Sequence, residues 1–247
     1  MNKRHSKILD LLAENDTCSV NRLSEILEVS SVTVRQDLNF LESEGFLKRV
    51  HGGAVLKDAD DISNRLGLHY DRKIKIARKA ASFVHDGDTI LIESGSINAL
   101  LAREIAKKEQ VTIITTNAYI ARQFRKNSEA NIVLLGGIYQ HLSESMVGKI
   151  TKIGIDQVNF SKAFLGIDGY TPESGFTLRD LLRAEISSYI IKKAKNVFVV
   201  TDSSKFGKTE LTNICDLKDI HHLITDDNLS ASYYKLIQRT GVNLTLV

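Results

Sequence analysis

Apolar residues recur with helical spacing along the first forty residues of the chain. Val34, Leu38 and Leu41 fall at positions i, i+4 and i+7, so they form one stripe on a helix. Ser30 precedes this helix and is a suitable N-cap. Two shorter stripes upstream predict two further helices, and their residues are Ile8, Leu11 and Leu12, then Leu23, Ile26 and Leu27. Three helices at this spacing are typical of a helix-turn-helix.

The face of the third helix opposite its apolar stripe is polar. Arg35, Gln36 and Asn39 lie there, and such side chains make bidentate hydrogen bonds to guanine or adenine in the major groove. Residues 46–50 then alternate apolar and basic side chains, and Gly52-Gly53 permits a tight reversal close to another backbone. We interpret this segment as a wing, with Lys48, Arg49 and His51 near phosphates. An ordinary three-helix bundle with solvated surface charges remains an open alternative.

Beyond residue 75, short apolar runs alternate with helical patterns. This alternation implies parallel βαβ units, and an open sheet with helices on both faces fits best. Strands are expected at 89–92, 111–114, 132–135, 163–167, 197–200, 223–225 and 242–247, and helices around 100–105, 118–125, 181–194 and 233–237. The charged, poorly periodic segment before them predicts an exposed connection. We therefore expect a helical domain over 1–57, a linker over 58–74 and a sheet domain over 75–247.

Polar residues and glycines follow the expected strands, at the edge where open sheets bind ligands. Glu93-Ser94-Gly95-Ser96 leads directly into a helix, whose unpaired N–H groups and positive dipole end favour an anion. Further strand ends carry Thr116 and Asn117, Gly136 and Gly137, Asp168 and Gly169, and Lys205. Their convergence at one edge favours a pocket for a phosphorylated polyol. Taken singly, each of them is more often an ordinary turn or capping residue.

Charge and composition change this interpretation only in part. The chain has a formal charge of +3, yet residues 1–57 contain eight Lys and Arg and eight Asp and Glu. DNA binding must therefore depend on placement, such as Lys3, Arg4 and Lys7 at the start of the first helix, and it should be salt-dependent. No charged-then-apolar leader and no apolar run of about 18 residues is found, which predicts a cytoplasmic protein without membrane contact. Cys18 and Cys215 are isolated, so we expect no metal site and no cofactor.

The segment from Thr33 to Ala54 resembles the DNA-binding domain of DeoR-type bacterial transcriptional repressors. The matching residues are Thr33, Val34, Arg35, Gln36, Asp37, Leu38, Arg49, His51, Gly52, Gly53 and Ala54. Gln36 is the departure, because relatives usually carry a second basic residue there. The resemblance implies DNA contacts from Ser31, Thr33, Arg35, Gln36, Asn39, Lys48, Arg49, His51 and Gly52. Asp37 borders the buried stripe, and we expect it to form a structural ion pair, with Arg49 as the candidate partner.

The strand-end residues, as an ordered set, resemble the C-terminal effector domain of the same family, which looks like the ribose-5-phosphate isomerase fold. The implied fold class is α/β, with a winged helix-turn-helix followed by a doubly wound, mainly parallel sheet. The resemblance implies that Lys205 binds a phosphate with Ser94, Gly95 and Ser96, and that Asp168 and Asn117 bind sugar hydroxyls. The full implied effector set is Ser94, Gly95, Ser96, Thr116, Asn117, Gly136, Gly137, Asp168, Gly169 and Lys205. The family's Asp-Ser-Gly-Thr-Thr loop is altered here at Glu93, Ser96 and Ile97.

Together these features predict a sequence-specific regulator of a carbohydrate-utilisation operon, acting as a repressor. Its expected partners are double-stranded operator DNA, a phosphorylated sugar or sugar alcohol, and a second copy of the chain in a homodimer or homotetramer. Two alternatives stay open. One is an isomerase-like enzyme with an appended DNA-binding domain, in which Asp168 or Glu185 acts as the base. The other is a DNA-binding protein that has no ligand.

Overall fold

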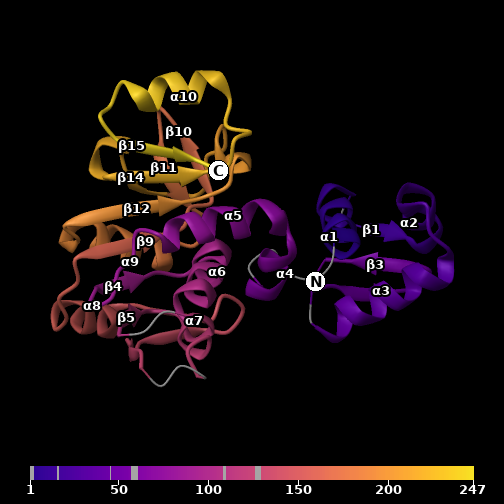
Figure 1. The fold of residues 1–247 in the computed structure, drawn as a ribbon, viewed down its shortest axis with the longest axis horizontal. Helices are drawn as coiled ribbons and strands as arrows, with labels where there is room; N and C mark the ends of the chain where they lie inside the picture. Colours follow the sequence, from indigo (N-terminus) through magenta and orange to yellow (C-terminus); the bar gives the residue numbers. More distant parts are fainter. Residues whose placement is uncertain (1–2, 16, 45, 57–60, 108–109, 126–128) are drawn as a thin grey trace. The chain divides into compact units, whose positions relative to one another are not determined.

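The chain divides into two compact units, Met1–Asp71 and Arg72–Val247 (Figure 1). The structure is a computed structural model that describes residues 3–15, 17–44, 46–56, 61–107, 110–125 and 129–247. Residues 58–74, predicted to be an exposed linker, contain α4 (Ile62–Gly67), in which Ile62 and Leu66 are buried, and the start of α5 (Tyr70–Ala81). Residues 57–60 lie outside the described part. The end of α4 packs closely against α1 of the first unit, because a Cβ on Gly67 would lie 2.3 Å from Leu9 Cδ1.

The first unit has the predicted winged helix-turn-helix. Its main elements are α1 (Lys3–Asn15), α2 (Val20–Leu27), α3 (Ser31–Ser43) and strands β1 (Thr17–Ser19), β2 (Lys48–Val50) and β3 (Gly53–Val55). The apolar stripes form its core, in which Ile8, Leu12, Leu23, Val34, Leu38 and Leu41 are fully buried. Ile26 differs from the prediction, because it is exposed. The N-cap role of Ser30 is confirmed, since its Oγ accepts a hydrogen bond of 3.1 Å from Thr33 N.

The wing is a three-stranded sheet in the order β1-β3-β2, and β1 was not anticipated. Cys18 of β1 lies opposite Ala54 of β3. The predicted close approach of the glycine pair to a backbone is confirmed, because a Cβ on Gly53 would lie 2.3 Å from Cys18 O. Gly52, with φ +75°, makes the turn. Gly52 therefore allows the chain to reverse, and Gly53 leaves room for β1 to pair with β3.

The second unit is built on a seven-stranded sheet whose neighbouring strands are all parallel. Its strands are β4 (Thr89–Ile92), β5 (Thr112–Thr115), β6 (Asn131–Leu134), β9 (Lys162–Leu165), β12 (Asn196–Val200), β14 (His222–Thr225) and β15 (Asn243–Leu246). The spatial order is β15-β14-β12-β9-β4-β5-β6. The direction of winding reverses between β4 and β9, so this pair is the topological switch point of a doubly wound sheet.

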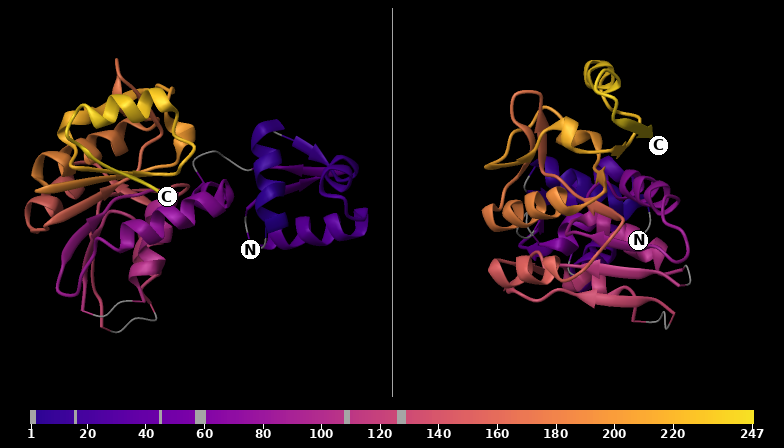
Figure 2. Two further views of the ribbon diagram at one scale, coloured as in Figure 1. Left: turned by 45° about the horizontal axis from the view of Figure 1, so that its top comes forward. Right: turned by 90° about the vertical axis from the view of Figure 1, so that its left-hand side faces the viewer.

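Helices cover both faces of this sheet, as predicted (Figure 2). One face carries α6 (Ser96–Ile105) and α7 (Ala118–Arg122), and the other carries α8 (Lys149–Asp156) and α9 (Leu181–Lys193) (Figure 1). The second unit also contains α10 (Ala231–Gln238), hairpin β7 (Ile138–Gln140) with β8 (Ser145–Val147), a small sheet of β10 (Gly169–Thr171), β11 (Gly175–Leu178) and β13 (Thr212–Cys215), and two short 3-10 helices, Ser203–Lys205 and Leu217–Asp219. None of the described helices combines the length and the apolar character needed to cross a membrane.

Candidate nucleic-acid interface and ligand site

The exposed face of α3 carries the side chains that were expected to read DNA. Arg35, Gln36 and Asn39 are exposed, and Ser31 and Thr33 are half-buried at the helix start. Sequence reasoning missed Val32, which is 58% exposed. Positions 32, 35, 36 and 39 share one face at the spacing i, i+3, i+4 and i+7, and this spacing was the available signal. A valine on such a face suits contact with a thymine methyl group.

Arg49 ties the wing to α3. Its backbone N donates a hydrogen bond of 2.7 Å to Glu42 Oε1, and its Nη1 donates to Asn39 Oδ1. Lys48, His51 and Gly52 are exposed on the same wing. The wing arginine is therefore partly engaged within the protein, and it orients a side chain of the helix beside it.

The expected ion pair between Asp37 and Arg49 is wrong. Asp37 is buried and faces α1, where Arg4 Nε lies 2.5 Å from Oδ2, Arg4 Nη2 donates to Oδ1 at 2.9 Å, and His5 Nε2 lies 3.0 Å from Oδ1. Burial raises the pKa of Asp37, but the hydrogen bonds and charges of Arg4 and His5 outweigh it and leave the pKa below its ordinary value. Arg4 therefore stabilises the fold. The side chain of Lys3 lies outside the described part.

A hollow of about 400 Å³ opens between α2, α3 and the wing. It is lined by Ser19, Val20, Asn21, Arg35, Arg49, His51 and Gly52. Ser19 is the N-cap of α2, and its Oγ accepts a hydrogen bond of 3.2 Å from Arg22 N. Backbone N–H groups at a helix start and arginine side chains together suit a phosphate. Sequence reasoning missed residues 19–21, although a serine before an apolar run signals a helix start.

The loop after β4 lies at the switch point of the sheet. Gly95 is the N-cap of α6 with φ +137°, and no side chain caps the helix there. Ser94 Oγ donates a hydrogen bond of 2.6 Å to Glu93 Oε1. Asn98 Nδ2 donates to the carbonyls of Glu93 at 2.9 Å and of Phe164 at 3.1 Å. The start of α6 is thereby fixed against β9, with its first N–H groups available to an anion.

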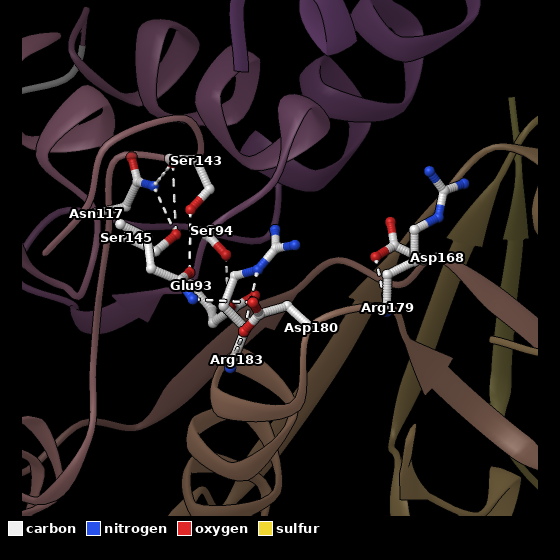
Figure 3. A network of polar contacts seen from close by, with 10 residues as sticks. Glu93, Ser94, Asn117, Ser143, Ser145, Asp168, Arg179, Asp180 and Arg183 are labelled. Atoms are coloured by element: carbon white, nitrogen blue, oxygen red, sulfur yellow. Dashed lines mark hydrogen bonds and ion pairs between the residues drawn. The ribbon is translucent and has the colours of Figure 1, made fainter. Parts of the chain in front are cut away.

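Asn117 is used within the protein. It is the N-cap of α7, since its Oδ1 accepts a hydrogen bond of 3.0 Å from Ile120 N. Its Nδ2 donates to Ser143 O at 2.8 Å and to Ser145 Oγ at 3.3 Å (Figure 3). The amide therefore holds the β7–β8 hairpin over the end of β5. Asn117 therefore has the helix-capping role that was the alternative to ligand binding in the sequence analysis. Contact between its side chain and a sugar hydroxyl would require these hydrogen bonds to rearrange.

The other rim residues differ in exposure. Thr116 is buried and its carbonyl accepts from Met146 N at 2.6 Å, whereas Gly136 and Gly137 are exposed. Asp168 is buried, and its Oδ2 accepts from Arg179 N at 3.3 Å. Gly169 is required by close packing, because a Cβ there would lie 2.5 Å from Lys208 O.

Lys205 is half-buried at the end of a short 3-10 helix, Ser203–Lys205, that follows β12. This helix is fixed by Asp202, whose Oδ1 accepts a hydrogen bond of 3.1 Å from Ser204 N. Because β9 separates β12 from β4, the backbone of Lys205 starts about two strand spacings, roughly 10 Å, from the loop after β4. The lysine and this loop therefore suit different ends of one ligand.

Sequence reasoning missed a buried arginine at this rim. Arg183 lies in the first turn of α9, whose N-cap Asp180 accepts a hydrogen bond of 2.8 Å from Arg183 N. Figure 3 shows the guanidinium directed toward Ser94 and Glu93. An aspartate before an apolar helix was a readable N-cap signal, but the direction of the next arginine depends on tertiary packing.

Comparison with known proteins gives matches along nearly the whole chain. Residues 4–60 match the profile of the DeoR-like helix-turn-helix domain, and residues 68–227 match that of the DeoR C terminal sensor domain. The HTH-type transcriptional regulator GolR of Listeria innocua is 31% identical over 97% of this chain and 96% of its own. The regulator FruR of Bacillus subtilis is 33% identical, over 91% and 90%. The lactose phosphotransferase system repressor of Lactococcus lactis is 30% identical, over 94% of each.

Among solved structures, ribose 5 phosphate isomerase A of Neisseria gonorrhoeae is similar to part of the chain. The match has a TM-score of 0.40 and 14% sequence identity, and it covers 54% of this chain and 52% of that one.

Proposed function

The chain belongs to the DeoR family of transcriptional regulators, and we propose that it represses a carbohydrate-utilisation operon in response to a phosphorylated sugar or sugar alcohol. The observation that carries the DNA-binding half is the single exposed face of α3, which places Val32, Arg35, Gln36 and Asn39 beside a wing lined with cations. The family is regulatory, so the enzymatic alternative is not retained. Glu185, one of its two candidate bases, is half exposed and pairs with Lys152. A regulator that reads DNA works in the cytoplasm, where the chromosome lies.

The polar side chains on the exposed face of α3 differ in the hydrogen bonds that they can offer to bases. Because Asn39 Oδ1 accepts from Arg49, Asn39 presents its NH2 group to the groove and acts as a donor toward guanine or thymine oxygens. Gln36 retains both halves of its amide, which suits a bidentate contact with adenine. Arg35 suits guanine. In this proposal Gln36 sets the operator base at which this regulator differs from relatives with a basic residue there.

DNA binding is tested by footprinting the full chain on the region upstream of its own gene and on neighbouring sugar-transport and catabolic genes. Arg35→Ala removes one bidentate contact and should weaken specific binding roughly tenfold or more while the protein stays folded. Arg78→Ala in the second unit is the matched control, because Arg78 is an exposed arginine outside the DNA-binding unit. Footprints that survive Arg35→Ala would show that α3 is not the reading helix.

The effector half of the proposal rests on the loop after β4. It ends a strand at the switch point, begins α6 without a side-chain cap, and is joined at the rim by Asp168 and Lys205. To change operator occupancy tenfold, an effector must favour one DNA-binding state by about 1.4 kcal/mol. Calorimetry with a panel of aldose, ketose and sugar-alcohol phosphates, each beside its unphosphorylated form, tests this. Absence of binding across the panel would rule out a phosphosugar effector and leave the ligand-free alternative.

We also propose a homodimer formed through the second unit. Apolar side chains are exposed on β7 and α8, where Ile138, Ile150 and Ile153 are 62%, 66% and 51% exposed. Ile150 and Ile153 lie on one face of α8, and a patch of this kind is typical of an interface. Paired recognition helices would then reach half-sites about 34 Å apart. Sedimentation of the full chain and of Ile153→Glu distinguishes a dimer, a tetramer and a monomer.

A further inference from the structure

Glu42 lies on the recognition helix α3 and contacts the wing. Its Oε1 accepts a hydrogen bond of 2.7 Å from the backbone N of Arg49 in β2. Among the described strands, β2 is an outer strand of the wing sheet and pairs with β3 alone. The N–H groups on the other edge of such a strand need an acceptor from elsewhere. Glu42 therefore supplies an acceptor from α3 to the open edge of the wing.

The side chain of the same arginine is held by the same helix. Arg49 Nη1 donates to Asn39 Oδ1, and Asn39 and Glu42 share one face of α3 because they are three residues apart. The recognition helix thus holds Arg49 both at its main chain and at its guanidinium. Arg49 also lines the hollow between α2, α3 and the wing, together with Arg35 and His51. The contact from Glu42 therefore helps to set the spacing of the cations around this hollow.

The charge of Glu42 and its hydrogen bond should act on DNA binding in opposite directions. Glu42 is exposed and places a negative charge next to Lys48 and Arg49, the wing cations expected near phosphates. A carboxylate in this place repels a DNA backbone, although salt weakens the repulsion. A solvated acid would therefore only lower the affinity for DNA. An acid that fixes the wing raises it, so the two roles can be separated by substitution.

We propose that Glu42 is a positioning residue for operator recognition. Through its hydrogen bond to Arg49 N it holds the wing against α3, so that the wing cations and the reading face of α3 bind the same stretch of DNA. Glu42 acts through Arg49 and not by contact with DNA. This inference rests on the proposed DNA-binding function, because it names a residue that arranges the same interface.

The test measures the affinity of the full chain and its variants for the operator duplex defined by footprinting, at several salt concentrations. Glu42→Gln keeps an acceptor oxygen at the same reach and removes the charge, so it should bind as tightly as the wild type or more tightly. Glu42→Ala removes the acceptor, and Glu42→Asp keeps the charge but is one methylene shorter. Both should bind about fivefold more weakly, the loss of one hydrogen bond. Their plot of log affinity against log salt should be shallower by about one, because a wing contact to phosphate is lost.

A matched control and a second measurement separate positioning from charge. Glu44→Ala removes an exposed acid from the C-cap of the same helix and should not weaken binding. If Glu42 acted only through its charge, Glu42→Ala would bind more tightly than the wild type and Glu42→Asp would bind equally well. Without DNA, hydrogen exchange followed by NMR should show the Arg49 amide exchanging faster in Glu42→Ala and Glu42→Asp than in the wild type.

The outcomes separate this inference from the proposed function. If the wild type binds no DNA duplex, the DNA-binding function fails and this assignment fails with it. If the wild type binds, then wild-type affinity in folded Glu42→Ala, affinity in Glu42→Gln as low as in Glu42→Ala, or unchanged exchange of the Arg49 amide overturns only the role of Glu42. Thermal unfolding shows whether each variant folds. Should Glu42→Ala not fold, equal affinity of folded Glu42→Asp and Glu42→Gln for the operator overturns the assignment.

Discussion

Replacing Asp37 by asparagine should loosen the first unit, because Asp37 joins the recognition helix α3 to α1. The side chain is 7% exposed and accepts two hydrogen bonds from Arg4, with His5 Nε2 3.0 Å away. Asparagine has the same size but no charge, and it retains one acceptor oxygen. The change therefore tests the charge-assisted bonds with little change in packing.

The expected loss for Asp37 is about 2 kcal/mol, within the range for a hydrogen bond to a charged group. The upper end of that range does not apply, because solvent reaches Arg4 and screens the pair. A loss of this size raises local opening of α1 and α3 roughly thirtyfold. Hydrogen exchange measured by mass spectrometry on the full chain reports it, with peptides from β4 and β9 as an internal reference. Glu44→Gln, at the exposed end of α3, is the control.

The same experiment has a pH dependence with a defined sign. The pKa of Asp37 is lowered in the folded protein, so its contribution is present above the ordinary value of about 3.9 and disappears as pH falls through the folded pKa. The difference between wild type and Asp37→Asn should persist from neutral pH to about pH 5 and should narrow below about pH 4. Equal exchange in both proteins at neutral pH, or a difference that persists once Asp37 is protonated, would refute the reasoning.

Three further predictions concern the wing, a cap and the thiols. Gly53→Ala places a Cβ 2.3 Å from Cys18 O, so it should separate β3 from β1 and weaken operator binding in a mobility-shift assay, whereas Gly136→Ala, with open space around it, should not. Ser30→Ala removes the N-cap of α3 and should cost about 1 kcal/mol of stability in thermal unfolding. Burial raises the pKa of Cys215 to about 12 and raises that of Cys18, so a thiol reagent at pH 8 should react slowly until the protein is denatured.

Elements stabilised by local contacts were predictable from the sequence. The stripe of Val34, Leu38 and Leu41 and the N-cap Ser30 all act within one helix, so their spacing carries the information. The seven strands of the large sheet were likewise readable as apolar runs. The strands β1, β7 and β10 have three residues each, too few for a periodic signal, and β1 is identified only by its pairing with distant β3.

Side-chain partners were much less predictable than elements. Asp37 had several possible cationic partners, and only the packing of α1 against α3 selects Arg4 and His5 over Arg49. The topology of the sheet brings the strand-end residues to one rim, which sequence alone anticipates. The sequence does not predict that the amide of Asn117 is hydrogen-bonded to the β7–β8 hairpin or that the side chain of Arg183 is directed toward Ser94. Both depend on contacts between segments that are distant in the chain.

The placement of charge explains how a DNA-binding region with no net charge can hold DNA. Two of its acids are engaged away from the reading face, Asp37 with Arg4 and Asp10 with His69 next to α4. The face made by α3 and the wing keeps Arg35 and Lys48 exposed. Few exposed cations per unit neutralise few phosphates, so in the proposed homodimer most of the affinity would come from binding both half-sites at once. The proposed effector would then control most of this affinity by preventing simultaneous binding, without altering any contact to DNA.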